Sequence, residues 1–115
     1  MSIDRFRPAI AQWAASFPAI RRVWLYGSRV KGTERPDSDL DVAVELDSLV
    51  LRGNPQFTYW MLESPAMKQT LSALIDVSPH VQLYHATQPE VFSPVAEHGI
   101  LVYDKATQAT GLQTT

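Results

Sequence analysis

The stretch LYGSRVKGTERPDSDLD, residues 25–41, places a Gly-Ser turn after an apolar run and two aspartates further along. Ten residues separate Ser28 from Asp39, and one residue separates Asp39 from Asp41. In an extended strand, side chains two positions apart point to the same face, so the two carboxylates would stand side by side. Paired carboxylates suit Mg²⁺, and the N–H groups of a turn at Gly27 and Ser28 suit phosphates. The stretch therefore predicts a site for a metal and a polyphosphate.

Regular elements are predicted on both sides of this stretch. Apolar residues spaced three and four apart predict an amphipathic helix over residues 3–16. An apolar run at 23–26, stopped by Gly27, predicts a buried strand. Residues 28–38 are polar and predict a loop with a short helical turn. Alternating acidic and apolar residues over 39–46 predict a second strand, antiparallel to the first.

The second half of the chain is predicted to add two helices and two strands. These elements are a helix starting at Ser64-Pro65, a strand at 81–84 after a break at Pro79, a helix opened by a Thr87/Glu90 capping box and ended by Gly99, and a strand at 100–103. Residues 49–63 give no clear pattern. Together the patterns predict an α/β (α+β) fold over residues 1–104, with a small mixed β-sheet and helices mainly on one face. The polar segment 105–115 is predicted to be a disordered tail.

Composition narrows the class of protein. At 115 residues the chain fits one domain, and the absence of Cys excludes disulfides and thiolate metal sites. There is no signal-peptide pattern and no apolar stretch long enough to span a bilayer, so a cytoplasmic protein without membrane contact is expected. The net charge of −2 combines a mostly basic segment before Asp37 with an acidic one after it. Because there is no general basic excess, direct nucleic-acid binding is not expected.

The central motif matches a known signature. Gly27-Ser28, the ten-residue gap and the Asp39-Leu40-Asp41 segment resemble the signature of the DNA polymerase β-type nucleotidyltransferase superfamily. The flanking residues look most like its minimal nucleotidyltransferases, which are single short domains. The resemblance implies transfer of a nucleoside monophosphate, with AMP from ATP as the expected case, to an acceptor hydroxyl. The hydroxyl would attack the α-phosphate in line while pyrophosphate leaves.

The resemblance also implies roles for individual residues. Asp39 and Asp41 would be the catalytic carboxylates that bind Mg²⁺, and a two-metal arrangement would stabilise both the attacking and the leaving oxygens. Gly27 and Ser28 would hold the β- and γ-phosphates of the nucleoside triphosphate. Arg29 and Lys31 are candidates for further phosphate contacts, although basic residues in a loop equally often face solvent.

One position departs from the family pattern. A third carboxylate usually stands on the next core strand, but the matching segment here places Gln82 there. An amide can offer a neutral oxygen to a metal but adds no negative charge. Asp76 and Glu45 are possible replacements. The chain could therefore bind a nucleotide and yet transfer it slowly or not at all.

Two classes of function follow from this ambiguity. The first is an active nucleotidyltransferase, and the second is a weak or inactive nucleotide-binding module that regulates a partner by direct contact. The resemblance implies a HEPN-type toxin as the partner, with a tyrosine of that toxin as the acceptor. The apolar segment 57–62 could cover this partner or a second copy of the chain. An aminoglycoside-type nucleotidyltransferase is disfavoured, because those enzymes usually need an extra domain.

Other side chains have less specific explanations. His80, His85 and His98 show no metal-ligand spacing relative to one another. His80 and His85 flank a strand, so surface or hydrogen-bonded positions are expected for these two. Ser28 has no recognisable triad partners. The aromatic residues around the motif and at 57–60 are expected to pack in the core or at an interface rather than stack on a base.

Overall fold

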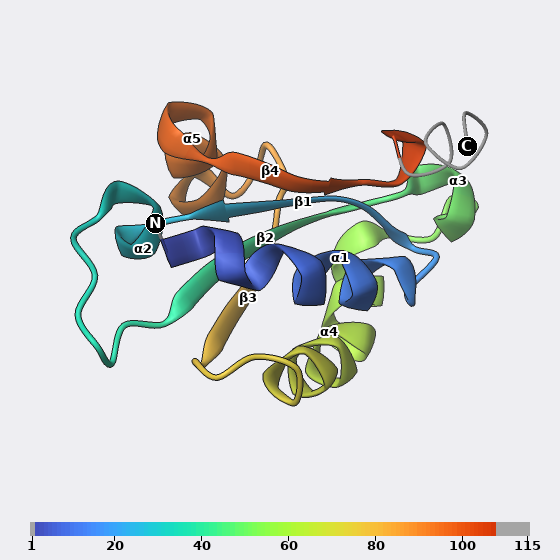
Figure 1. Ribbon diagram of the computed structural model, residues 1–115. Helices are drawn as coiled ribbons and strands as arrows, with labels where there is room; N and C mark the ends of the chain where they lie inside the picture. The colour runs from blue at the N-terminus through green and yellow to red at the C-terminus, as the bar shows by residue number, and fades with distance from the viewer. Residues whose placement is uncertain (1, 108–115) are drawn as a thin grey trace.

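A four-stranded mixed sheet forms the centre of the protein (Figure 1). The computed structural model describes residues 2–107. The strands are β1 (Ile20–Tyr26), β2 (Leu40–Leu46), β3 (Pro79–Leu83) and β4 (Ile100–Asp104), in the order β3-β2-β1-β4. β1 runs antiparallel to both β2 and β4, whereas β3 runs parallel to β2. The predicted mixed sheet and the antiparallel pairing of its first two strands are thus confirmed.

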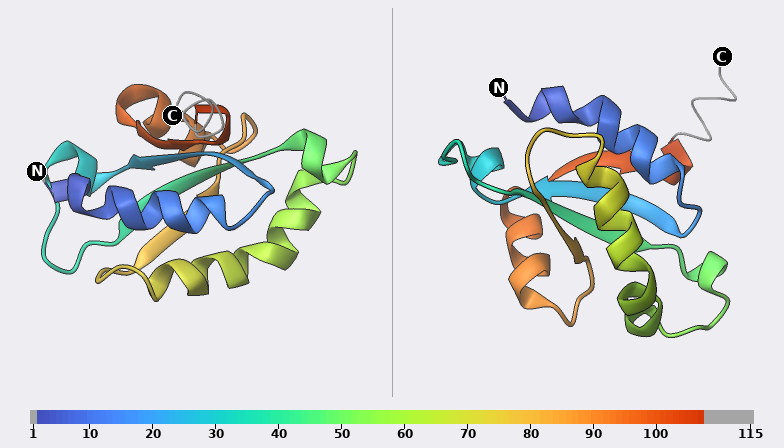
Figure 2. Two further views of the ribbon diagram at one scale, coloured as in Figure 1. Left: turned by 45° about the vertical axis from the view of Figure 1, so that its right-hand side comes forward. Right: turned by 90° about the horizontal axis from the view of Figure 1, so that it is seen from below.

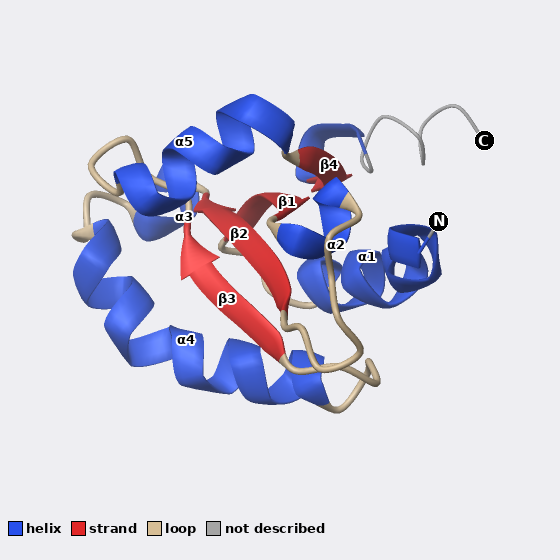
Figure 3. Ribbon diagram, turned by 90° about the vertical axis from the view of Figure 1, so that its left-hand side faces the viewer, coloured by secondary structure: helices blue, strands red, loops and turns tan. Residues whose placement is uncertain are grey.

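Helices cover both faces of this sheet unequally. The helical elements are a 3₁₀ turn η1 (Ser2–Phe6), α1 (Arg7–Ala15), α2 (Ser28–Lys31), α3 (Ser48–Leu51), α4 (Gln56–Ser72) and α5 (Pro89–His98). Helices α1 and α4 lie on one face, and α5 lies on the other (Figures 1 and 2). Viewed from the side, the strands separate α5 from α1 and α4 (Figure 3). The fold matches the predicted one, with helices mainly on one face.

The main hydrophobic core lies between the sheet and the α1/α4 layer. Alternate residues of β1 and β2 point into it, among them Leu25, Val42 and Val44, and all three are fully buried. Trp13 of α1 ties the two helices together, since its indole N–H donates a hydrogen bond to the carbonyl of Met67 in α4 at 2.9 Å. The strand alternation that the sequence shows therefore turns one face of the sheet into the core.

A smaller packed layer lies under α5. Val91 and Val95 of the helix contact Tyr26 and Ala43, which belong to the opposite face of the same strands. Near its edge, Tyr84 stacks against both Trp24 and Phe92. The predicted packing role of the motif's aromatic neighbours is confirmed for Trp24. The side chain of Asp41 points to the same face, so α5 and the Asp41 carboxylate lie on one side of the sheet.

The sequence misplaced the start of the longest helix. α4 begins at Gln56, so Ser64 is not an N-cap and Pro65 lies inside the helix. An internal proline loses a backbone hydrogen bond and costs about 3 kcal/mol. The packing of Tyr59 and Trp60 against the core offsets the cost of the proline. Met67 and Leu71 are buried in the same core further along the helix. Tertiary packing of the first half therefore overrides the local proline signal.

Two further boundaries differ from expectation. Thr87 caps nothing, because its hydroxyl contacts the ring of His85 at 2.8 Å, and α5 begins at Pro89 without a side-chain cap. β3 begins at Pro79 rather than after it, at the first strand position, where a missing N–H is tolerated. Gly99 does end α5, but with extended backbone. It is a glycine because a Cβ would collide with Val95.

The expected tail lies partly outside the described residues. Lys105, its first member, belongs to the fold: its ammonium bonds to Asp47 at 2.6 Å and to the carbonyl of Pro18 at 2.7 Å. The remainder from residue 108 falls outside the described range. Within that range, no helix combines the length and apolar character needed to cross a bilayer.

Candidate functional site

The Gly-Ser turn lies directly against the acidic strand. Gly27 links β1 to α2 with φ of 82°, a conformation that other residues adopt only with strain. A Cβ at this position would overlap Oδ2 of Asp41. Glycine is therefore required twice, by the backbone turn and by the close approach of the carboxylate.

A histidine from α5 fixes the same turn. The N–H of Gly27 donates a hydrogen bond to Nε2 of His98 at 2.9 Å. His98 is the last residue of α5, so the C-terminal end of that helix is tied to the start of the motif. Since Nε2 accepts this bond, the ring proton of a neutral His98 must lie on Nδ1.

The turn opens the short helix α2, as the sequence predicted for this loop. Ser28 and Lys31 are its first and last residues. The N–H groups of Val30 and Lys31 both donate to the carbonyl of Gly27 at 3.1 Å, whereas those of Ser28 and Arg29 belong to the first turn and have no partner within the helix. Lys31 is exposed. Free N–H groups and a nearby ammonium form an environment suited to an anion.

Arg29 is buried, unlike most basic residues in loops. Its side chain is 9% exposed, and its Nε and Nη2 donate to the carbonyl of Ser38 at 3.1 and 2.8 Å. The guanidinium thus joins α2 to the residue that precedes Asp39. In this arrangement Arg29 orders the loop between the turn and the carboxylates, and its contact with a phosphate remains a prediction.

The two motif aspartates differ in their surroundings. Asp39 lies one residue before β2 and is exposed, whereas Asp41 lies within the strand with a side chain that is 24% exposed. Asp41 pairs with Tyr26 across β1 and with His80 across β3. Its two oxygens face different neighbours, since Oδ2 lies beside Gly27 and Oδ1 lies 3.2 Å from Nδ1 of His80.

A short hydrogen-bonded chain continues from Asp41 along β3. The Nε2 atom of His80 lies 2.8 Å from the amide nitrogen of Gln82. Because His80 and Gln82 are two residues apart in the strand, they share the face that carries Asp41. Gln82 is therefore connected to the acidic strand through His80.

The two alternative carboxylates have other partners. Asp76 accepts two bonds from Nη1 of Arg5, at 2.7 and 2.9 Å. Glu45 lies on the strand face of Asp41, but its carboxylate is 3.4 Å from Nη1 of Arg22. Both carboxylates are thus paired with arginines, and their role as a replacement for the third carboxylate stays a prediction.

The carboxylate also affects a buried tyrosine. Burial raises the pKa of Tyr26 to about 12, and the negative charges of Asp41 and Glu90 add to this rise. The phenol therefore stays protonated at neutral pH. Tyr26 and Glu90, which lies in the first turn of α5, thus belong to the electrostatic surroundings of the motif.

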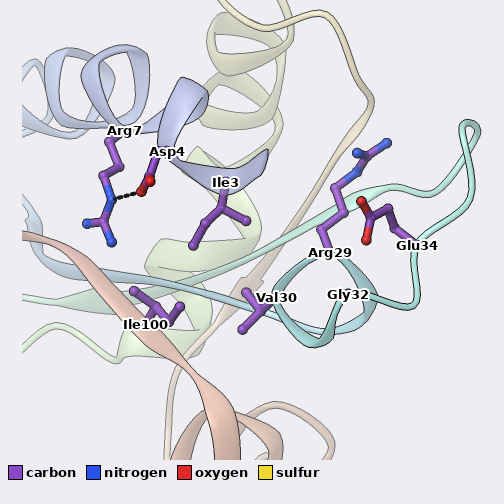
Figure 4. A pocket seen from close by; sticks show the side chains of 8 residues that line it. All are labelled: Ile3, Asp4, Arg7, Arg29, Val30, Gly32, Glu34 and Ile100. Carbon is purple, nitrogen blue, oxygen red and sulfur yellow. Dashed lines mark hydrogen bonds and ion pairs between the residues drawn. The ribbon is translucent and has the colours of Figure 1, made fainter. Parts of the chain in front are cut away.

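The largest described pocket lies beside the motif rather than in it. It has a volume of about 530 Å³ and is lined by Ile3, Asp4, Arg7, Arg29, Val30, Gly32, Glu34 and Ile100 (Figure 4). Oδ1 of Asp4 accepts a bond from Arg7 at 2.9 Å. Oε1 of Glu34 is buried and has no hydrogen-bond partner among the described residues. The lining contains Arg29, one of the predicted phosphate contacts, but neither motif carboxylate, so this pocket does not include the predicted metal ligands.

Two residues near the motif were not predicted to take part. His80 was expected to be a surface or hydrogen-bonded residue, and no role was assigned to His98. Both are hydrogen-bonded, His80 to Asp41 and His98 to Gly27. His80 lies next to Asp41 because of the parallel register of β2 and β3, which the sequence pattern does not predict. The spacing of His80 and Gln82 was a usable signal, because it puts both on one strand face. His98 offered no comparable signal, since its position depends on how α5 packs.

Comparisons with known proteins agree with this geometry. A family model described as polymerase beta, nucleotidyltransferase, matches residues 9–108. A crystal structure described as a toxin–antitoxin with AMP-PNP is similar in fold, with a TM-score of 0.65 at 17% identity over 89% of this chain and 76% of that one. A mutant of the toxin–antitoxin MntA-HpeT gives 0.64 at 16% identity, with the same coverages.

A third structure, of a protein assigned as a nucleotidyltransferase from Sulfolobus solfataricus, gives a TM-score of 0.52 at 16% identity and covers 90% of this chain and 81% of that one. No curated protein sequence matches the chain. At these identities the structural matches establish the fold alone, and the family model covers most of the chain.

Proposed function

Because the chain belongs to the polymerase beta nucleotidyltransferase family, we propose that it transfers AMP from ATP to a hydroxyl group of an acceptor. The observation that carries this proposal is the close approach of Gly27 to Asp41. A turn with free N–H groups and a carboxylate at its edge can hold a phosphate and its counter-ion side by side.

The residues present fit a divalent cation shared with the substrate. Within residues 2–107, no three or more His, Cys, Asp or Glu side chains converge into a complete metal site. Mg²⁺ does not need one, because it is usually bound through one or two carboxylates together with substrate phosphates. The carboxylate of Asp41, whose Oδ2 occupies the space where a Cβ of residue 27 would lie, is held beside the turn and is suited to this role, with Asp39 as the second carboxylate. The bound metal would neutralise charge on the phosphates and on the leaving pyrophosphate.

The chain's own residues would position the triphosphate. The N–H groups of Ser28 and Arg29 would donate to its oxygens, and the ammonium of Lys31 would add a positive charge. Arg29 would act chiefly by holding Ser38 and, through it, the loop that leads to Asp39. In the reaction, the acceptor oxygen bonds to the α-phosphorus, the bond to the β-phosphate oxygen breaks, and pyrophosphate and the hydroxyl proton are released.

The proposed acceptor is a tyrosine of a HEPN-type toxin. Two structures of similar fold are described as toxin–antitoxin structures, one of them with AMP-PNP. This chain exposes large apolar side chains on α3 and α4, since Leu49 is 83%, Met61 76% and Leu62 72% exposed. Such a surface suits a protein partner, with a second copy of the chain as the other possible occupant.

One observation favours a second function. On β3 the face beside Asp41 carries His80 and Gln82 rather than a carboxylate. If the lost negative charge prevents transfer, the chain acts as a nucleotide-binding module that neutralises its partner by contact alone.

The first prediction concerns Mg²⁺-dependent ATP binding, measured by calorimetry. Asp41→Asn should weaken this binding at least about tenfold, because an amide replaces a charged oxygen ligand. Asp76→Asn is the matched control, since Asp76 is exposed and paired with Arg5. Equal loss in both variants, or no ATP binding by the unmodified chain with any divalent metal, would contradict the proposed site.

Transfer itself is tested with α-labelled ATP and the toxin produced from the neighbouring reading frame. Label on the toxin that disappears when its acceptor tyrosine is replaced supports the enzyme. Tight toxin binding without label, in the presence of ATP and metal, supports the contact-only module.

A further inference from the structure

The residue next to Asp41 on the neighbouring strand β3 is His80, and its imidazole lies on the same face of the sheet as the carboxylate. In the parallel register, Asp41 pairs with His80 and Ala43 pairs with Gln82. Nδ1 of His80 and Oδ1 of Asp41 are 3.2 Å apart. The His80 side chain is 46% exposed, so its ring is open to a ligand from solvent.

This separation suits two neighbouring ligands of one metal ion. Metal–ligand distances of about 2.1 Å and right-angled coordination place adjacent donor atoms about 3 Å apart. Resting on the proposed function, we propose that Nδ1 of His80 is a metal ligand beside Asp41. The site then has a mixed oxygen and nitrogen donor set and prefers Mn²⁺ or Co²⁺ to Mg²⁺.

Gln82 completes this arrangement. A histidine that binds a metal through one ring nitrogen usually donates the N–H of the other nitrogen to a nearby acceptor. In the structure the amide nitrogen of Gln82 lies 2.8 Å from Nε2 of His80 and donates to it, so Nδ1 carries the ring proton and faces Asp41. When Nδ1 holds the metal, Nε2 carries the proton, and the amide turned about its last bond accepts it through Oε1. Gln82 is then a positioning residue for His80 rather than a defective third carboxylate.

The chemistry of imidazole explains the change in metal preference. Carboxylate and carbonyl oxygens suit both Mg²⁺ and Mn²⁺, so the imidazole nitrogen of His80 is the donor that would raise the affinity for Mn²⁺ or Co²⁺ above that for Mg²⁺. The hydrogen-bond alternative, in which Nδ1–H simply donates to Asp41, would leave selectivity to the oxygen ligands and the phosphates. The two arrangements therefore differ in measured metal selectivity, not only in activity.

The experiment measures binding of Mn²⁺ to the full chain by electron paramagnetic resonance, with Mg²⁺ as competitor and α,β-methylene-ATP as the nucleotide. This analogue cannot be transferred, because a carbon replaces the oxygen that links its α- and β-phosphates. The unmodified chain should bind Mn²⁺ at least about tenfold tighter than Mg²⁺, and pulsed measurements should detect a nitrogen nucleus coupled to the bound Mn²⁺. His80→Ala should remove this nitrogen coupling and most of the preference. His80→Asp should restore binding but favour Mg²⁺ relative to the unmodified chain.

Two further variants complete the test. Gln82→Ala should weaken Mn²⁺ binding several-fold and keep the nitrogen coupling, as for the loss of an outer partner. His85→Ala is the control, because His85 contacts Thr87 and Phe57 rather than Asp41, and its Mn²⁺ affinity should be unchanged. Thermal melting of each variant checks that it is folded.

The outcomes separate this inference from the proposed function. If metal binding depends on Asp41 but His80→Ala changes neither the nitrogen coupling nor the selectivity, the imidazole ligand is wrong and the nucleotidyltransferase site stands. If the folded chain binds no divalent metal even with the nucleotide analogue, both are wrong.

Discussion

The two faces of the sheet use the same strands for different purposes. Towards α1 and α4, Leu25, Val42 and Val44 are fully buried in a continuous apolar core. Towards α5, the intervening positions include Asp41, which contacts His80, and only a small apolar cluster is present. Because adjacent residues of a strand face opposite sides, β1 and β2 can hold the fold on one side and carry polar chemistry on the other. Substitutions on the two faces should therefore change different measurements.

The largest effect should come from the core face. Leu25→Ala removes a fully buried side chain from β1 and should lower the free energy of unfolding by about 2–5 kcal/mol. Leu101→Ala is the matched control on the neighbouring strand β4, where the side chain is 44% exposed. Its cost should stay below about 1 kcal/mol. Urea unfolding measures both, and equal costs would mean that the two faces do not differ as described.

The second effect should be confined to the opposite face. Gly27→Ala forces a Cβ into Oδ2 of Asp41, whereas Gly53→Ala, at a similar φ of 83°, meets nothing within 4 Å. Gly53→Ala should lose about 1–2 kcal/mol of stability from backbone strain. Gly27→Ala should lose more, because its ψ of −159° places it in a region that is essentially restricted to glycine. Only Gly27→Ala should also lose Mg²⁺-dependent ATP affinity, by about tenfold or more. Calorimetry with ATP distinguishes them, and a parallel loss of affinity in Gly53→Ala would show that strain alone is responsible.

The smallest effect concerns an ion pair away from both faces. A hydrogen bond from Lys105 is the main cause that lowers the pKa of Asp47 below its usual 3.8. A lowered pKa stabilises the fold at pH values above 3.8, and this contribution is lost as pH falls through the native pKa. Lys105→Met should therefore reduce the free energy of unfolding at pH 7 by about 0.5–1 kcal/mol. Below pH 4, the variant should lose less stability with falling pH than the unmodified chain does.

Unfolding at several pH values measures that effect. Arg7→Met, which breaks the exposed pair with Asp4, is the control and should change little at any pH. A larger loss in Arg7→Met than in Lys105→Met would contradict the assignment.

Local patterns were sufficient for most of the architecture. The alternation over residues 39–46 and the apolar run before Gly27 predicted β2 and β1, because a strand with one buried face has a period of two. The start of α4 was missed, since Pro65 is a strong local signal that only the packing of Tyr59 and Trp60 overrides. The ends of helices and strands that depend on tertiary contacts cannot be predicted from short windows of sequence.

The candidate site was predictable to the same extent. The turn and the aspartate pair lie within one short stretch of the sequence, and their closeness in space follows from the antiparallel pairing of β1 and β2. The neighbours of Asp41 on β3 depend instead on the register of a parallel pair joined by a long crossover. That register placed His80, rather than Gln82, opposite the aspartate. A sequence alignment to a motif compares positions along the chain, whereas the site depends on positions across the sheet.

The contact between Arg29 and Ser38 has a consequence for variation and engineering. Its acceptor is a main-chain carbonyl, so it depends on the path of the loop and not on the side chain at position 38. The segment between the turn and the carboxylates should therefore accept few changes of length. Changes of residue should be tolerated at exposed positions such as Thr33 and Asp37, whereas Ser38 is constrained because its hydroxyl accepts a bond from the N–H of Arg35. Such exposed positions offer sites for labels or altered charge close to the proposed triphosphate site, provided that Arg29 is kept.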